Sequence, residues 1–111
     1  MNKDYLGILT EIDKYEESSP ERLLFLSVIF QALLDATKEK TKIESSRTSV
    51  ERANARAWFF CSVGVTCDNF EYVCENAGMN AQYTRSFALK VINSKEIKYV
   101  RQRIRRVLDK S

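Results

Sequence analysis

Apolar side chains recur at steps of three and four residues along most of this 111-residue chain. This spacing is typical of helices that bury one face, and it predicts helices at 3–17, 20–37, 48–62, 69–77, 80–92 and 95–109. The chain has one proline and three glycines, too few for a turn-rich β fold. We therefore expect a single all-α domain over 1–111, with five or six helices depending on whether the acidic segment 1–18 is stable or frays.

The segment 20–37 stands out because it is apolar on nearly every face. Ser19 is a good N-cap, and Pro20 suits the first turn of a helix. The large apolar residues that follow are Leu23, Leu24, Phe25, Leu26, Val28, Ile29, Phe30, Leu33 and Leu34. A helix of this kind has to be surrounded. We expect it to be the central core helix, or else part core and part homodimer interface.

A polar stretch without periodicity, 38–47, follows this helix and is the best candidate for a mobile loop. Thr48 and Glu51 have the spacing of a capping box and predict the start of the next helix. We expect that helix to end near Gly64 and to have an inner face of Val50, Ala53, Ala57, Trp58 and Cys61. Trp58 is interpreted as a core anchor, with a stacking platform for a nucleic-acid base as the alternative.

The span 68–92 contains two helical segments separated by a short turn. Asp68 is followed by a glutamate three residues later and predicts a capped helix start. In the turn, Gly78 tolerates the left-handed conformation, Met79 can tuck between the helices and Asn80 is a good N-cap. This spacing resembles the helix-turn-helix of bacterial and phage DNA-binding proteins, although αα-corners share it. The inward positions expected on the second helix are Tyr83, Phe87 and Val91, with Thr84 where a Val or Ile is usual.

The outward face of the helix that starts at Asn80 offers side chains suited to DNA. Gln82 can pair with adenine and Arg85 with guanine in the major groove. Ser86 can reach a base or a phosphate, and Lys90 lies a turn further, at a position better suited to a phosphate. We therefore predict that Gln82, Arg85 and Ser86 read bases.

The C-terminal segment 94–110 is a basic amphipathic helix. Residues 85–111 carry nine basic and two acidic side chains, a net charge of +7, whereas 1–84 carry nine and thirteen, a net charge of −4. The apolar stripe that docks this helix consists of Ile97, Val100, Ile104, Val107 and Leu108. We expect its other faces to contact DNA phosphates through Lys95, Lys98, Arg101 and Arg105. A solvated helix face without a partner is the alternative.

Several classes of function are disfavoured by what the chain lacks. It has no histidine, which removes His-based catalysis and His-ligated metal sites. Cys61, Cys67 and Cys74 are spaced unlike zinc ligands. We expect no enzyme, no metal and no cofactor, with free thiols in a reducing cytoplasm. The first residues lack a signal-peptide core, and the longest apolar run, 23–34, is too short to span a membrane.

A set of residues between positions 50 and 92 carries a further resemblance: Trp58, Phe70, Val73, Cys74, Ala77, Gly78, Met79, Asn80, Tyr83 and Arg85. This run is similar to a small helical protein type of tailed phages and prophage-like elements, such as gene-transfer elements. The resemblance implies control of transcription. We therefore expect a regulator that binds double-stranded DNA. The alternatives are a factor that binds RNA polymerase in initiation or antitermination, another protein-interaction adaptor, and a small terminase-like packaging protein.

Overall fold

The computed structural model describes residues 3–15 and 17–110, and within these ranges the chain forms six α-helices and no strand. The helices are α1 (Lys3–Tyr15), α2 (Pro20–Ala36), α3 (Ser46–Phe60), α4 (Val65–Ala77), α5 (Ala81–Ile92) and α6 (Ile97–Lys110). The all-α prediction is confirmed, and the acidic N-terminal segment forms a helix of its own. That helix ends at Tyr15, and Glu17 already lies in a turn, while residue 16 lies outside the described part.

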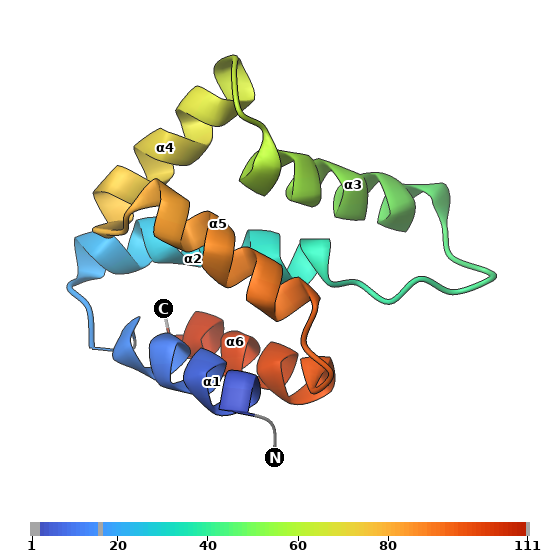
Figure 1. The fold of residues 1–111 in the computed structure, drawn as a ribbon, viewed down its shortest axis with the longest axis horizontal. Helices are drawn as coiled ribbons and strands as arrows, with labels where there is room; N and C mark the ends of the chain where they lie inside the picture. The colour runs from blue at the N-terminus through green and yellow to red at the C-terminus, as the bar shows by residue number, and fades with distance from the viewer. Residues whose placement is uncertain (1–2, 16, 111) are drawn as a thin grey trace.

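The helices form three tiers (Figure 1). α2 and α5 lie in the middle, with α3 and α4 on one side of them and α1 and α6 on the other. The molecule measures 40 × 38 × 24 Å, and its shortest dimension corresponds to two helices, each about 10–12 Å across with side chains. α2 packs against α3, α4, α5 and α6, so it is the element that joins the tiers.

α2 is the central core helix, as its apolar sequence predicts. Its buried side chains include Leu26, Ile29, Phe30, Leu33 and Leu34. Ser19 caps its start, since the Ser19 hydroxyl accepts a hydrogen bond from the amide of Arg22 at 3.4 Å. Two large apolar side chains of this helix stay outside the core: Leu24 is 66% exposed and Val28 is 45% exposed.

Arginine side chains from other helices donate hydrogen bonds to the last carbonyls of α2 and α4. The Arg101 guanidinium donates to the carbonyl of Leu34 at 2.6 Å, and that of Arg56 donates to the carbonyl of Ala36 at 3.0 Å. At α4, Arg22 Nε donates to the Ala77 carbonyl at 3.2 Å. The last carbonyls of a helix lack partners within it and carry its negative dipole end. These arginines therefore pin α2, α3, α4 and α6 to one another.

The structure corrects two predicted helix starts. α3 begins at Ser46 because Ser45 is its cap, accepting a hydrogen bond from the Thr48 amide at 3.2 Å, so Thr48 lies inside the helix. α4 begins at Val65, directly after Gly64, without a side-chain cap, so Asp68 also lies inside its helix. Both helices begin about one turn earlier than the capping boxes predict, because the N-cap positions are Ser45 and Gly64 and not Thr48 and Asp68.

The inner face predicted for α3 is wrong in part. Its buried residues are Ala55 and Phe59, whereas Val50, Ala53 and Ala57 are exposed. The Phe59 ring packs 5.9 Å from the ring of Phe70 on α4, and this contact turns the helix away from the predicted face. Trp58 is partly buried against the core, as expected, with its ring centroid 4.9 Å from that of Phe70.

The connector expected to be mobile is anchored by ion pairs. Arg52 on α3 binds both carboxylate oxygens of Glu44, at 2.9 and 2.7 Å, and its hydrogen bonds lower the pKa of that carboxyl. Lys38, at the start of the connector, pairs with Glu51 on α3 and with Asp35 on α2. A bidentate arginine–carboxylate pair adds geometric specificity to attraction. The connector therefore has a defined path between α2 and α3.

Replacing Gly78, at the end of α4, tests the turn that leads into α5. Gly78→Ala is expected to lower the free energy of unfolding by about 1–2 kcal/mol, because alanine is strained in the left-handed conformation. The added methyl group would also overlap the Arg22 guanidinium. Urea unfolding followed by circular dichroism measures the change.

Gly7→Ala in α1 is the matched control for this substitution. A Cβ at Gly7 meets no atom within 4 Å, and alanine is better than glycine in a helix by about 0.5–1 kcal/mol. This variant is expected to be as stable as the wild type or slightly more stable. Equal stability of the Gly78→Ala variant and the wild type would contradict the described turn.

Candidate nucleic-acid interface

The turn between α4 and α5 has the local geometry that its sequence predicts. Gly78 is left-handed, with φ of 74° and ψ of 28°. Met79 is buried, and the side-chain oxygen of Asn80 accepts a hydrogen bond from the amide of Tyr83 at 2.9 Å. The Gly78, Met79 and Asn80 predictions are therefore confirmed. αα-corners and helix-turn-helix motifs share this kind of turn, so the turn orients α5 without assigning it a ligand.

The inward side of α5 differs from the prediction at one position. Phe87 and Val91 are buried as expected, and Thr84 is fully buried, with its hydroxyl donating to the Asn80 carbonyl at 2.8 Å. Tyr83, predicted to point inward, is 43% exposed. Its hydroxyl donates to the Glu11 carboxylate on α1, so this ring lies against the neighbouring helix at the surface.

Arg85, which the sequence predicts to read a base, is engaged with another helix in this structure. Its Nε donates to the Phe59 carbonyl at 3.0 Å, and its Nη2 lies 3.4 Å from the Cys61 carbonyl. The guanidinium also lies 4.8 Å from the centre of the Phe70 ring. The side chain therefore points to the C-terminal end of α3 and not outward to a base. The physical reason is the same as for Arg101 and Arg22: a helix end without internal partners recruits an arginine.

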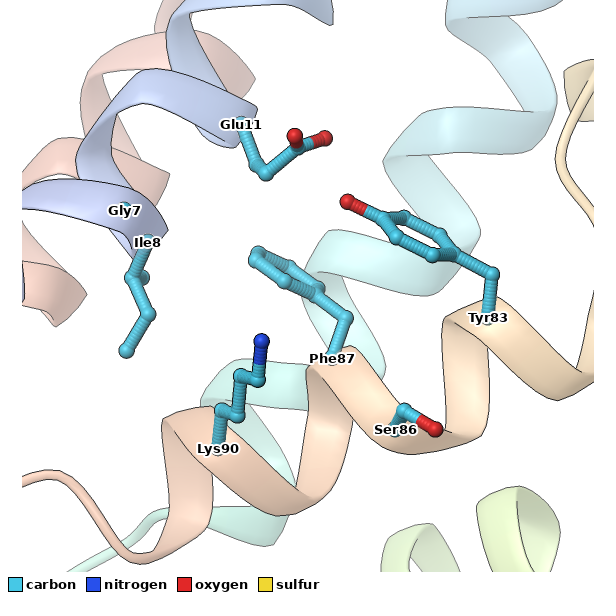
Figure 2. Close-up of a pocket in the computed structure, with 7 residues that line it drawn as sticks. All are labelled: Gly7, Ile8, Glu11, Tyr83, Ser86, Phe87 and Lys90. Atoms are coloured by element: carbon cyan, nitrogen blue, oxygen red, sulfur yellow. The ribbon is translucent and has the colours of Figure 1, made fainter. Parts of the chain in front are cut away.

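The other predicted residues of α5 lie on its exposed surface. Gln82, Ser86 and Lys90 are exposed, and Leu89 is half exposed beside them. α5 is drawn in front of α2 in Figure 1, between α3 and α1. Lys90 departs from the expected position, because its ammonium group points toward α1 and into a small cavity (Figure 2).

The basic side chains of α6 and of the turn before it, which contains Lys95, divide into two groups. Arg101 and Arg103 are engaged within the fold: Arg101 binds the Leu34 carbonyl and the Thr37 hydroxyl, each at 2.6 Å, and Arg103 pairs with Asp13 on α1 at 2.7 Å. The second group is exposed and forms no ion pair with any residue that the structure describes. It consists of Lys95, Lys98, Arg105 and Arg106.

A hollow of about 490 Å³ brings several of these cations together. It lies between α6 and the C-terminal end of α2, and its lining consists of Thr37, Lys38, Glu39, Ile97, Lys98, Arg101, Gln102 and Arg105. Burial and the charge of Arg105 lower the pKa of Arg101. Since Arg101 and Arg105 repel each other here, an anion in the hollow would be stabilised by both of them and by Lys98, which lines it too.

Two parts of this surface are not evident from the sequence. Helical spacing places Arg106 on α6 but does not distinguish it from the engaged Arg103. Thr37 and Lys38 join the hollow only because the end of α2 packs beside α6. The sequence carries no local signal for such a contact, since more than sixty residues separate the two segments.

The described ranges contain neither a candidate cluster of metal ligands nor a helix that could cross a membrane. No group of three or more His, Cys, Asp or Glu side chains in them is arranged to hold a metal ion. No helix in them combines the length and apolar character needed to cross a bilayer. Cys67 and Cys74 are buried free thiols, and burial raises the pKa of both.

Comparison with known proteins assigns no family to this chain. None of the family models, curated proteins or solved structures matches it. The candidate interface therefore rests on the residues and geometry described above.

Removing the Arg85 side chain tests its position in the fold. Arg85→Ala is expected to lower the free energy of unfolding by about 1–3 kcal/mol, because it leaves the Phe59 and Cys61 carbonyls without their charged donor. Gln82→Ala, on the exposed face of the same helix, is the control and is expected to stay within about 0.5 kcal/mol of the wild type. Chemical denaturation measures both. If the two variants are equally stable, Arg85 does not support the end of α3.

Proposed function

We propose that this chain is a regulator of transcription that binds double-stranded DNA, with the outer face of α6 as its phosphate-contacting surface. The observation that carries the proposal is the group of exposed cations, Lys95, Lys98, Arg105 and Arg106, next to the hollow that also contains Arg101. DNA presents a regular row of phosphates, and cations on one helix face can follow it. The resemblance to phage and prophage-type helical proteins supports transcription as the process.

α5 is the candidate base-reading helix in this proposal. Gln82 and Ser86 are exposed on it, and both side chains can donate and accept hydrogen bonds at base edges. With Arg85 bound to the end of α3, the strongest partner for guanine is no longer available. We therefore expect phosphate contacts to supply most of the affinity and α5 to add modest sequence preference.

A single reading helix covers few base pairs, so useful specificity requires a second copy or a partner. The exposed side chains Leu24 and Val28 of α2 are the candidate contact for a second copy. α2 remains the core helix in such a dimer, and only its outer edge contacts the second copy.

Neutralising two cations at the hollow tests the proposed DNA contact. The double variant Lys98→Gln/Arg105→Gln is expected to weaken binding to all duplexes equally and to reduce the salt slope by about 1 per lost phosphate contact. Fluorescence anisotropy with a random 30-base-pair duplex, titrated at several salt concentrations, measures both effects.

The matched control is Lys14→Gln/Arg47→Gln, which removes two positive charges from α1 and α3. It has the same net charge as the test variant, so a general effect of charge would appear equally in both. An equal salt slope for the two double variants would show that the hollow does not contact DNA. Absence of any binding at low salt would set aside DNA binding as a whole.

A second candidate function, binding to RNA polymerase, is favoured by an apolar hollow on another face. It has a volume of about 680 Å³ and lies between α2, α3 and α6, with Leu24, Val28, Trp58 and Leu108 in its lining. Exposed apolar surface of this kind marks contacts with other proteins.

Purified RNA polymerase and the immobilised protein test this second function. Polymerase should be retained after nuclease treatment and lost with the variant Leu24→Asp/Val28→Asp. Retention that disappears with nuclease alone would show that DNA is the bridge. Analytical ultracentrifugation of the wild type and of the same variant separates polymerase binding from dimerisation. If Leu24 and Val28 form a dimer interface, the wild type is a dimer and the variant is a monomer.

A further inference from the structure

A small cavity lies between α1 and α5, and no residue of α6 is part of its lining (Figure 2). It has a volume of about 350 Å³, and its lining consists of Gly7, Ile8, Glu11, Tyr83, Ser86, Phe87 and Lys90. Ile8 and Phe87 are almost completely buried and form an apolar floor. The polar groups of Glu11, Tyr83 and Lys90 converge above that floor. Small-molecule sites combine an apolar body with a few placed polar groups in this way.

The two charged groups of the cavity are compensated unequally. The Glu11 carboxylate accepts hydrogen bonds from the Tyr83 hydroxyl and from Lys14, which lies 3.2 Å away, and these bonds lower the pKa of Glu11. Lys90 forms no ion pair with a residue in the described ranges, and its ammonium group points into the cavity. The charge of Lys90 also lowers the pKa of Glu11, so Lys14 and Lys90 together exceed this single carboxylate by one positive charge, which a bound anion would neutralise.

The backbone of α1 leaves room for a ligand beside these groups. Gly7 lines the cavity, and a Cβ built there meets no atom within 4 Å. A volume of about 350 Å³ lies at the lower end of the range of roughly 300–1,000 Å³ for small-molecule sites. The space therefore suits a compact molecule and not an extended chain.

We propose that this cavity binds a small carboxylate with a compact apolar body. The carboxylate pairs with the Lys90 ammonium, while the apolar body lies against the floor formed by Ile8 and Phe87. A single charge fits better than a phosphate dianion, because one lysine offers one charge and the Glu11 carboxylate lies in the same cavity. The site is separate from the proposed DNA contacts on α6 and shares only Ser86 with the proposed reading face of α5.

Phenylacetate and its neutral analogue phenylacetamide are the probes for this site. In amide NMR spectra of the whole protein, phenylacetate is expected to shift the signals of Ile8, Ser86, Phe87 and Lys90. Lys90→Met is expected to weaken the binding of phenylacetate at least tenfold, and phenylacetamide is expected to bind the wild type just as weakly. Lys42→Met, which removes a charge from the connector outside the cavity, is the control and leaves the affinity unchanged.

Gly7→Leu fills the cavity from α1 and provides a second test that does not alter charge. It is expected to abolish phenylacetate binding, while a thermal melt shows a folded protein because leucine favours helices. Equal binding of phenylacetate by the wild type and the Lys90→Met variant would overturn the proposal, as would signal shifts outside the cavity only. Because DNA binding is measured without the probe, its failure and the failure of this site are separate results.

Discussion

The fold depends on arginine side chains that complete the C-terminal ends of neighbouring helices. A helix end that is packed inside a small protein loses water as a partner for its last carbonyls, and a buried unpaired carbonyl is costly. Here Arg101 and Arg56 donate hydrogen bonds to carbonyls at the end of α2. Arg85 donates to a carbonyl at the end of α3, and Arg22 to one at the end of α4. Each donor comes from a different helix than its acceptor. The same bonds therefore satisfy the backbone and fix how the helices sit around α2.

This use of arginine decides where exposed positive charge remains on the surface. The basic residues of the C-terminal third are similar in sequence, yet the fold engages Arg85, Arg101 and Arg103 and leaves Lys98 and Arg105 exposed. Positive charge is thereby concentrated at one side of α6, around a hollow whose own arginine is held in place by α2. An arginine that is already oriented loses little freedom when it meets an anion, which favours binding there.

α5 contacts a different helix on each of two sides, α3 on one and α1 on the other. On one side α5 is held to α3 by Arg85, and on the other side Tyr83 reaches Glu11 on α1. The strip between these two sides contains Gln82 and Ser86, the exposed polar groups of the candidate reading helix. Lys90 lines the cavity beside α1 together with Ser86, and no cation of α6 is part of that lining. One helix thus borders two chemically distinct surfaces.

Local sequence is sufficient to predict the helices of this protein but not to predict which of their polar side chains are free at its surface. Apolar periodicity predicts the six helices and the central position of α2, and the left-handed conformation that Gly78 tolerates predicts the turn into α5, because these features depend on neighbours within a few residues. The direction of Arg85, the engagement of Arg101 and the exposure of Tyr83 were not predictable in this way. Periodicity predicts the direction in which a side chain leaves the axis of its own helix. Only the packing of the helices decides whether a carbonyl, a carboxylate or water lies in that direction, because the carbonyls and carboxylates belong to segments far away in the chain.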